Sequence, residues 1–246
     1  MTTATEIPNC VVVQHEMSGR RTPLLAVCGV CGGAGATTIA TLIARAAAEE
    51  GHVLLMDTGG LTGGLSSLTR IQTPWSFLEA SDLLVRDPSL GLGLWDVASS
   101  DGFELRVIAG GVEVRRDPDP GRIEDALDLL RDEFAHALVV VDCGTLQRDT
   151  DRIVLRAASH VAWVTPGSHR GLSQATQLRR HIKPCRGSQE LIVTRRDDAD
   201  PTLPIAALAR AWRCPLVLVP ELASSLARAE EEAQVAMEAV LGVLRR

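Results

Sequence analysis

Residues 31–38, Cys-Gly-Gly-Ala-Gly-Ala-Thr-Thr, are the residue types in this chain best suited to bind a phosphate group. Gly32, Gly33 and Gly35 let the backbone turn tightly and aim its N–H groups at one point. A helix that begins near Thr37 adds the positive end of its dipole at the same place. The segment therefore predicts a phosphate-binding loop.

The segments on either side of this loop support the prediction. Residues 24–28 form an apolar run typical of a buried strand, and residues 39–48 are rich in Ala and predict a helix. Strand, glycine loop and helix is the order that such loops require. The lysine that usually precedes the Ser/Thr is replaced by Ala36. A tight strand-to-helix turn without a ligand is the alternative interpretation.

Two aspartates end predicted strands elsewhere in the chain. Asp57 closes the run 52–57, and Asp142 closes the strongly apolar run 137–142. In open α/β sheets, ligands bind outside the carboxyl ends of the strands. A carboxylate at that edge can hold magnesium, as in Walker-B strands. The alternative is a structural role, with each aspartate capping a helix or pairing with an arginine.

The loop resembles the deviant phosphate loop KGGxGKTT of the ParA/MinD family of dimeric P-loop ATPases. The two lysines of that pattern fall on Cys31 and Ala36, and the magnesium-binding threonine falls on Thr37. The first switch of the family, DxDxxxG, matches at Asp57, but its second aspartate, which orients the attacking water, falls on Gly59. Three groups that serve catalysis in the family are therefore absent here.

The resemblance covers about residues 23–235 and implies ATP and magnesium as cofactors. It assigns magnesium to Thr37 and Asp142 and leaves Asp57 as the remaining catalytic candidate. Thr194 stands where the family has an asparagine beside the adenine. The nucleotide contacts that the resemblance implies are Gly32, Gly33, Ala34, Gly35, Ala36, Thr37, Thr38, Thr194, Arg195 and Pro220.

Three functions fit these residues. Phosphoryl transfer needs charge neutralisation and a positioned water, and removing one such group costs roughly 3–4 kcal/mol. The first hypothesis is therefore a spatial-positioning or assembly scaffold with a degenerate site, similar to the TadZ/CpaE proteins of pilus and secretion systems. The second is an active ATPase of the partition or division-site type, in which an arginine supplies the missing charge. The third is a thiol- or metal-regulated switch at Cys28, Cys31 and Cys143.

Composition limits the partners. The net charge of −6 argues against a nucleic-acid partner. Lys183 is the single lysine of the chain, so apart from Lys183 only an arginine could replace the missing lysine of the loop. The six cysteines and the absence of a secretion signal predict a cytoplasmic protein. The resemblance implies a homodimer and protein partners of a pilus, secretion or division assembly, through which any membrane or polar association would be made.

Strands and helices alternate about seven times along the chain. This pattern predicts an α/β fold with a doubly wound, mainly parallel sheet of about seven to eight strands and helices on both faces. Residues 1–22 are expected to form a partly ordered leader with a short strand at 11–13, and residues 23–246 a single domain. Residues 87–103 contain Pro, Gly and Asp and predict an irregular connection.

Overall fold

A computed structural model gives the structure of most of the chain. The strand expected at residues 11–13 lies outside the described residues, but Arg21 is described and forms ion pairs with Asp128 and Asp132. The described residues are 21–58, 64–71, 73, 75–89, 96–100, 103–109, 119–132, 137–195, 202–223 and 225–245.

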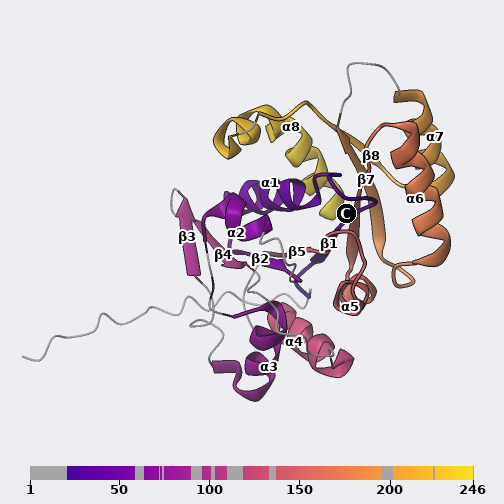
Figure 1. The fold of residues 1–246 in the computed structure, drawn as a ribbon. Coiled ribbons are helices and arrows are strands. Elements are labelled where there is room, and N and C mark those ends of the chain that lie inside the picture. Colours follow the sequence, from indigo (N-terminus) through magenta and orange to yellow (C-terminus); the bar gives the residue numbers. More distant parts are fainter. Residues whose placement is uncertain are drawn as a thin grey trace, which may run out of the picture.

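One eight-stranded sheet organises the structure, in the order β3-β4-β2-β5-β1-β6-β7-β8 (Figure 1). Every neighbouring pair is parallel except β3 and β4. The predicted doubly wound, mainly parallel α/β fold is confirmed. The strands are β1 (Leu24–Gly29), β2 (Val53–Asp57), β3 (Asp96–Ser100), β4 (Phe103–Ile108), β5 (Leu138–Asp142), β6 (His160–Val164), β7 (Gln189–Arg195) and β8 (Leu216–Val219).

Helices cover both faces of this sheet. Figure 1 shows α1 and α8 together on one side and α3 and α4 on the opposite side. Among the described residues, no helix is long and apolar enough to cross a membrane. The helices are α1 (Ala36–Ala48), α2 (Gly64–Thr69), α3 (Phe77–Arg86), α4 (Pro120–Asp132), α5 (Asp149–Ala157), α6 (His169–His181), α7 (Thr202–Trp212) and α8 (Leu226–Leu244).

The central strands are apolar along their whole length because both of their faces are covered. In β1, Leu25 and Val27 belong to the core under α1 and α8, whereas Leu24 and Ala26 belong to the core under α3, α4 and α5. Such double burial places β1 and β5 rigidly in the middle of the sheet. The segments that follow these two strands are therefore held at one fixed edge.

One segment differs from the expectation. Residues 87–103 were expected to be irregular, but β3 lies within them and pairs antiparallel with β4. Its sequence, Asp-Val-Ala-Ser-Ser, lacks the apolar pattern of a buried strand, and an edge strand needs only backbone pairing on one side. The short helix α2 begins inside the glycine-rich stretch after β2, where Leu65 is completely buried and anchors it.

Candidate functional site

The glycine loop joins the end of β1 to the start of α1 and is open to solvent. Gly33 and Gly35 have φ values of 75° and 93°, which side chains with a Cβ rarely adopt. A Cβ placed on Gly32, Gly33 or Gly35 would meet no atom within 4 Å. Gly33 and Gly35 are therefore required by conformation rather than by crowding, and the space above the loop is free for a ligand.

Backbone hydrogen bonds hold the base of the loop against two neighbouring strands. The Gly29 amide donates to the Gly144 carbonyl at 2.7 Å, and the Val30 amide donates to the Val164 carbonyl at 3.0 Å. A side chain on Gly29 would come within 3.3 Å of the Gly144 oxygen, so only glycine fits without displacement. The loop is thus positioned in advance by the ends of β5 and β6.

Ala36 occupies the place of the usual loop lysine, in the first turn of α1. Only 8% of its surface is exposed, and it belongs to the core cluster shared with Ile39 and Ala40. A methyl group therefore stands where a phosphate-binding loop usually carries a cation. The other expected lysine position, Cys31, is half-buried in the loop itself. Gly59, the third departure, lies outside the described residues.

The two strand-end aspartates lie side by side beneath the loop. Asp57 of β2 is in register with Asp142 of β5, and the Asp142 carboxylate accepts a hydrogen bond from the Gly144 amide at 3.0 Å. Burial, and then the neighbouring Asp57 carboxylate, raise the pKa of Asp142 to about 6, although the Thr37 hydroxyl and the Gly144 amide oppose this shift. Thr37 and Asp142, the two expected magnesium ligands, are therefore in contact.

The donor set fits magnesium when the ion also binds a phosphate. Mg²⁺ favours oxygen ligands and commonly binds one or two carboxylates together with phosphates and waters. Thr37, Asp57 and Asp142 provide a hydroxyl and two carboxylates at one point. Across the part of the chain that the structure describes, no group of three His, Cys, Asp or Glu side chains could hold a metal by itself.

A cavity of about 230 Å³ adjoins the loop between α1, α8 and the ends of β6, β7 and β8. Its walls are mostly apolar, and Arg195 is the one charged residue among the described residues that line it. An apolar slot with few polar groups is typical of a small-molecule site. The lining residues are Ala34, Gly35, Thr38, Ile39, Leu68, Val164, Val193, Arg195, Val219, Leu222, Ala223, Leu226 and Ala229.

The structure thus brings some of the expected nucleotide contacts together and leaves others aside. Ala34, Gly35, Thr38 and Arg195 line the cavity, whereas Thr194 is buried in β7 and does not reach it. Pro220 lies between the lining residues Val219 and Leu222 without lining the cavity itself. Leu68, Val164, Leu222, Leu226 and Ala229 were not anticipated, because apolar residues carry no sequence signal that separates a cavity wall from a core.

The cysteines lie close to the loop but differ in access. Cys28 in β1 and Cys143, directly after the neighbouring strand β5, are completely buried. Burial, and contact with the Cys28 thiol, raise the pKa of Cys143 well above its usual value. Because the thiolate is the reactive form, this pair has the environment of structural rather than regulatory thiols.

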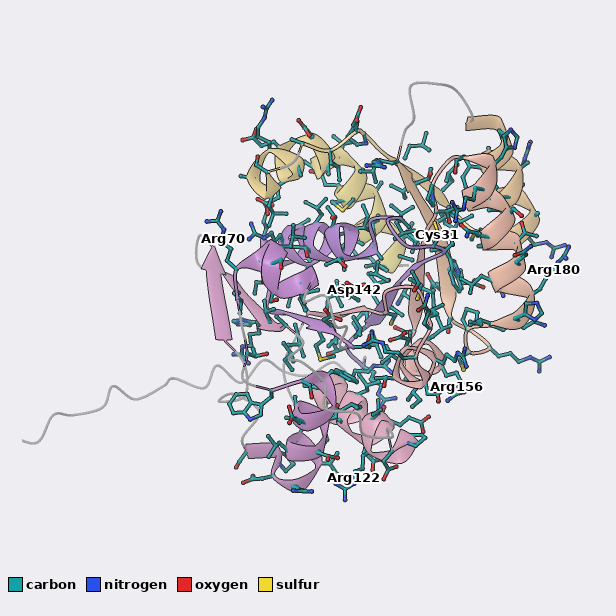
Figure 2. The ribbon with its side chains drawn as sticks, in the orientation of Figure 1. Cys31, Arg70, Arg122, Asp142, Arg156 and Arg180 are labelled. Atoms are coloured by element: carbon teal, nitrogen blue, oxygen red, sulfur yellow. The ribbon has the colours of Figure 1, made fainter. Side chains whose placement is uncertain are left out.

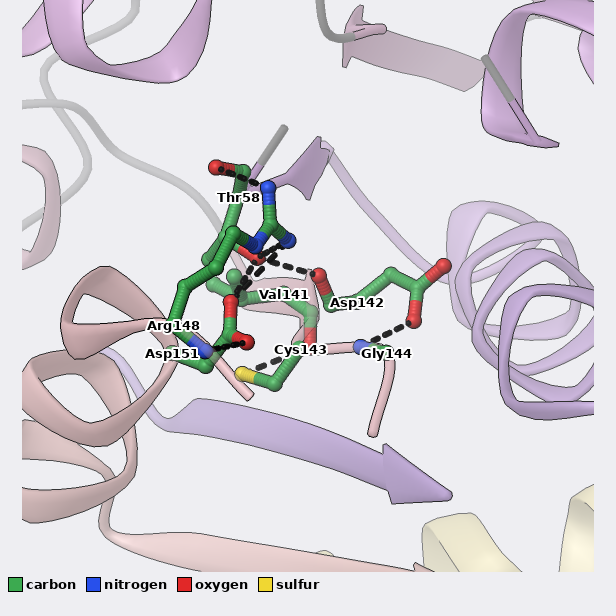
Figure 3. Close-up of polar contacts among 7 residues, drawn as sticks. All are labelled: Thr58, Val141, Asp142, Cys143, Gly144, Arg148 and Asp151. Atoms are coloured by element: carbon green, nitrogen blue, oxygen red, sulfur yellow. Dashed lines mark hydrogen bonds and ion pairs between the residues drawn. The ribbon is translucent and has the colours of Figure 1, made fainter. Parts of the chain in front are cut away.

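Arg148, the arginine that follows β5, is bound elsewhere than to the Asp142 carboxylate. Figure 2 shows Asp142 near the centre of the molecule and Arg122 and Arg180 at its periphery. Arg148 is nearer in the sequence to the end of β5, and it bonds to Thr58 and Asp151 (Figure 3). The Asp142 carboxylate points away from this guanidinium.

Comparison with known proteins is informative at the level of structure. No family model matches the chain, and no curated protein sequence matches it. A ParA family ATPase from Chlorobium tepidum superposes with a TM-score of 0.67 at 19% identity, covering 89% of this chain and 93% of its own. The chain has the fold of the ParA/MinD ATPases.

Two MinD structures give the same result. MinD from Pyrococcus horikoshii, complexed with Mg-ADP, superposes with a TM-score of 0.67 at 17% identity and covers 90% of this chain and 96% of its own. MinD in a MinC:MinD complex from Aquifex aeolicus has a TM-score of 0.67 at 16% identity, with 92% and 95% covered. The ParA/MinD fold therefore extends over nearly the whole chain, whereas identities this low leave its activity undetermined.

Proposed function

We propose that this protein is a nucleotide-binding positioning or assembly scaffold of the ParA/MinD type whose catalytic site is degenerate. One observation carries the proposal: the glycine loop keeps its open conformation beside a cavity and an acidic pair, while Ala36 places a methyl group where the cation belongs. Binding requires the cradle, but phosphoryl transfer also requires charge neutralisation at the γ-phosphate. The groups that binding requires are retained, whereas the charged group that phosphoryl transfer requires is lost.

The bound ligand in this proposal is ATP with magnesium. The cavity would take the base against its apolar walls, and the loop amides at the start of α1 would take the phosphates. Thr37 and Asp142 would hold the magnesium, with Asp57 beside them. Magnesium would supply the positive charge that Ala36 does not, so nucleotide affinity is expected to depend strongly on the metal.

Partner binding is the proposed output of this site. The structures that share the fold include one of MinD in complex with MinC, so the fold can present a docking surface to another protein. For this chain we propose a homodimer across the glycine loop and a partner from a pilus or secretion assembly, by its resemblance to TadZ/CpaE proteins. Any cytoplasmic positioning at a membrane or cell pole would then be made through that partner.

Calorimetric titration with Mg-ATP, run beside a malachite-green phosphate assay, tests the binding proposal. We expect saturable binding without turnover above that of a Thr37→Ala and Asp142→Ala double variant, which removes both expected magnesium ligands. Turnover that Asp142→Ala abolishes would overturn the degenerate-site reading. Absence of any binding would overturn the nucleotide proposal itself.

An active ATPase is the second candidate, and Arg195 is the observation that favours it. Arg195 lines the cavity together with Gly35 and Thr38 of the glycine loop and the first turn of α1, and in this second proposal its guanidinium would extend from there to the phosphates. Arg195→Gln should then abolish turnover. If Arg195→Gln only weakens nucleotide binding and the wild type shows no turnover, the scaffold is favoured.

A further inference from the structure

Asp151, in the first turn of α5, carries a buried carboxylate that the proposed nucleotide site does not use. Only 1% of the residue is exposed. Its Oδ2 accepts from the Arg148 amide at 3.0 Å, and its Oδ1 forms an ion pair with the Arg148 guanidinium at 3.0 Å. The same Oδ1 accepts from the Thr58 hydroxyl at 2.7 Å. A buried carboxylate with this many donors is held in one orientation.

Arg148 and Thr58, which both bond to Asp151, also bond directly to each other. Its guanidinium donates to the Thr58 carbonyl at 3.2 Å and to the Thr58 hydroxyl at 2.9 Å (Figure 3). Thr58 is completely buried, and its amide donates to the Asp142 carbonyl at 3.2 Å. Thr58 therefore uses its amide, hydroxyl and carbonyl to bond to a segment about ninety residues away in the sequence.

The position of Thr58 places this network next to the paired aspartates. Thr58 directly follows Asp57 at the end of β2, and Arg148 and Asp151 follow Asp142 at the end of β5. The contacts therefore join Thr58, which directly follows Asp57, to the start of α5, the first helix after Asp142. The β2–β5 register ends at Asp57 and Asp142, so contacts beyond this pair add to what the strand pairing already provides.

We propose that Thr58, Arg148 and Asp151 form a latch that holds Asp57 and Asp142 side by side beneath the glycine loop. The three are positioning residues: they act on the acidic pair through the backbone that follows it. The Asp142 carboxylate points away from the guanidinium in Figure 3, so Arg148 is committed to the latch and does not replace the missing loop lysine. The metal-binding consequence of the latch rests on the proposed function.

Backbone amide exchange tests the latch without any nucleotide. The variant is Thr58→Val, which removes the hydroxyl at nearly constant volume, and Thr58→Ser is the conservative variant that keeps it. Thr176→Val is the matched control, because it removes a helix hydroxyl that donates to the Leu172 carbonyl at 2.9 Å. The reporting amides are Thr58, bonded to the Asp142 carbonyl, and Gly144, bonded to the Asp142 carboxylate.

The latch predicts at least tenfold faster exchange at position 58 and at Gly144 in Thr58→Val. The Thr165 amide, bonded to Val193 between β6 and β7, should keep its rate, and Thr58→Ser should restore slow exchange. Unchanged rates at both reporters would overturn the proposal. So would an equal acceleration at Thr165, because that result means global destabilisation.

Nucleotide affinity supplies a readout that a purely structural role would not move. With ATP as the probe, Thr58→Val should weaken binding at least fivefold in magnesium and leave binding in EDTA unchanged. Equal weakening in both conditions would mean that the latch does not position the acidic pair, and would overturn that role. If the wild type binds no ATP in either condition, the proposed function fails, while the exchange rates still decide whether the latch exists.

Discussion

Asp57 and Asp142 occupy paired positions at the carboxyl ends of the neighbouring parallel strands β2 and β5, and both are less than one-tenth exposed. Two buried carboxylates held side by side repel each other and lose hydration. This pair is therefore a source of instability that a purely structural site would have little reason to keep.

The first prediction concerns the pH dependence of stability. The folded-state pKa of Asp142 is about 6, above its ordinary value of 3.8, so between these values the folded state binds more protons than the unfolded state. The free energy of unfolding should therefore fall as pH rises from about 4 to about 6. The full shift corresponds to roughly 3 kcal/mol.

Asp142→Asn removes this titration and is expected to raise the free energy of unfolding at pH 7.5 by roughly 1–3 kcal/mol. Urea denaturation at pH 4.5 and pH 7.5 measures the effect, with Asp149→Asn, an exposed aspartate at the start of α5, as the control. Parallel pH profiles for wild type and Asp142→Asn would contradict the prediction.

The second prediction restores the missing cation. Ala36→Lys is expected to strengthen ATP binding about tenfold or more, because a cation near the phosphates adds a charge-assisted interaction worth roughly 1.5–3 kcal/mol. Ala36→Met has a similar length without the charge and is the matched control. Calorimetry with ATP checks both variants, and equal affinities for the two would show that charge at position 36 is not what the loop lacks.

The third prediction tests whether Gly35 is required by its backbone conformation rather than by crowding. Gly35→Ala is expected to lower the free energy of unfolding by about 1–2 kcal/mol, because φ is 93° there while no atom crowds the new methyl group. Gly32→Ala is the control, since its position is equally open and its φ is not positive. Thermal denaturation of both variants is the measurement, and a matching loss in Gly32→Ala would refute the conformational argument.

The fourth prediction concerns the thiols. Cys28 and Cys143 should stay unmodified by Ellman's reagent in the folded protein, because they are completely buried and burial raises the pKa of Cys143. Exposed Cys185 should react rapidly, and half-buried Cys31 more slowly. Peptide mapping by mass spectrometry distinguishes the sites. Rapid modification of Cys28 or Cys143 would revive the thiol-regulated switch.

The sequence by itself determined the local elements around the loop. An apolar strand, a glycine segment and an Ala-rich helix each depend on neighbouring residues, so β1, the loop and α1 could be predicted from composition and order. The same holds for the strand-end positions of Asp57 and Asp142. The absence of lysine at positions 31 and 36 is a property of the sequence alone.

Only the tertiary structure decided how these elements combine. The register of β2 and β5 sets the two aspartates side by side. The apolar cavity is lined by three helices and three strands that are distant in sequence, and Arg148 reaches Thr58 across ninety positions. Edge strand β3 depends on pairing with β4 rather than on its own polar residues. Such contacts depend on which segments lie together in the folded chain, and a local sequence pattern does not indicate which distant segments these are.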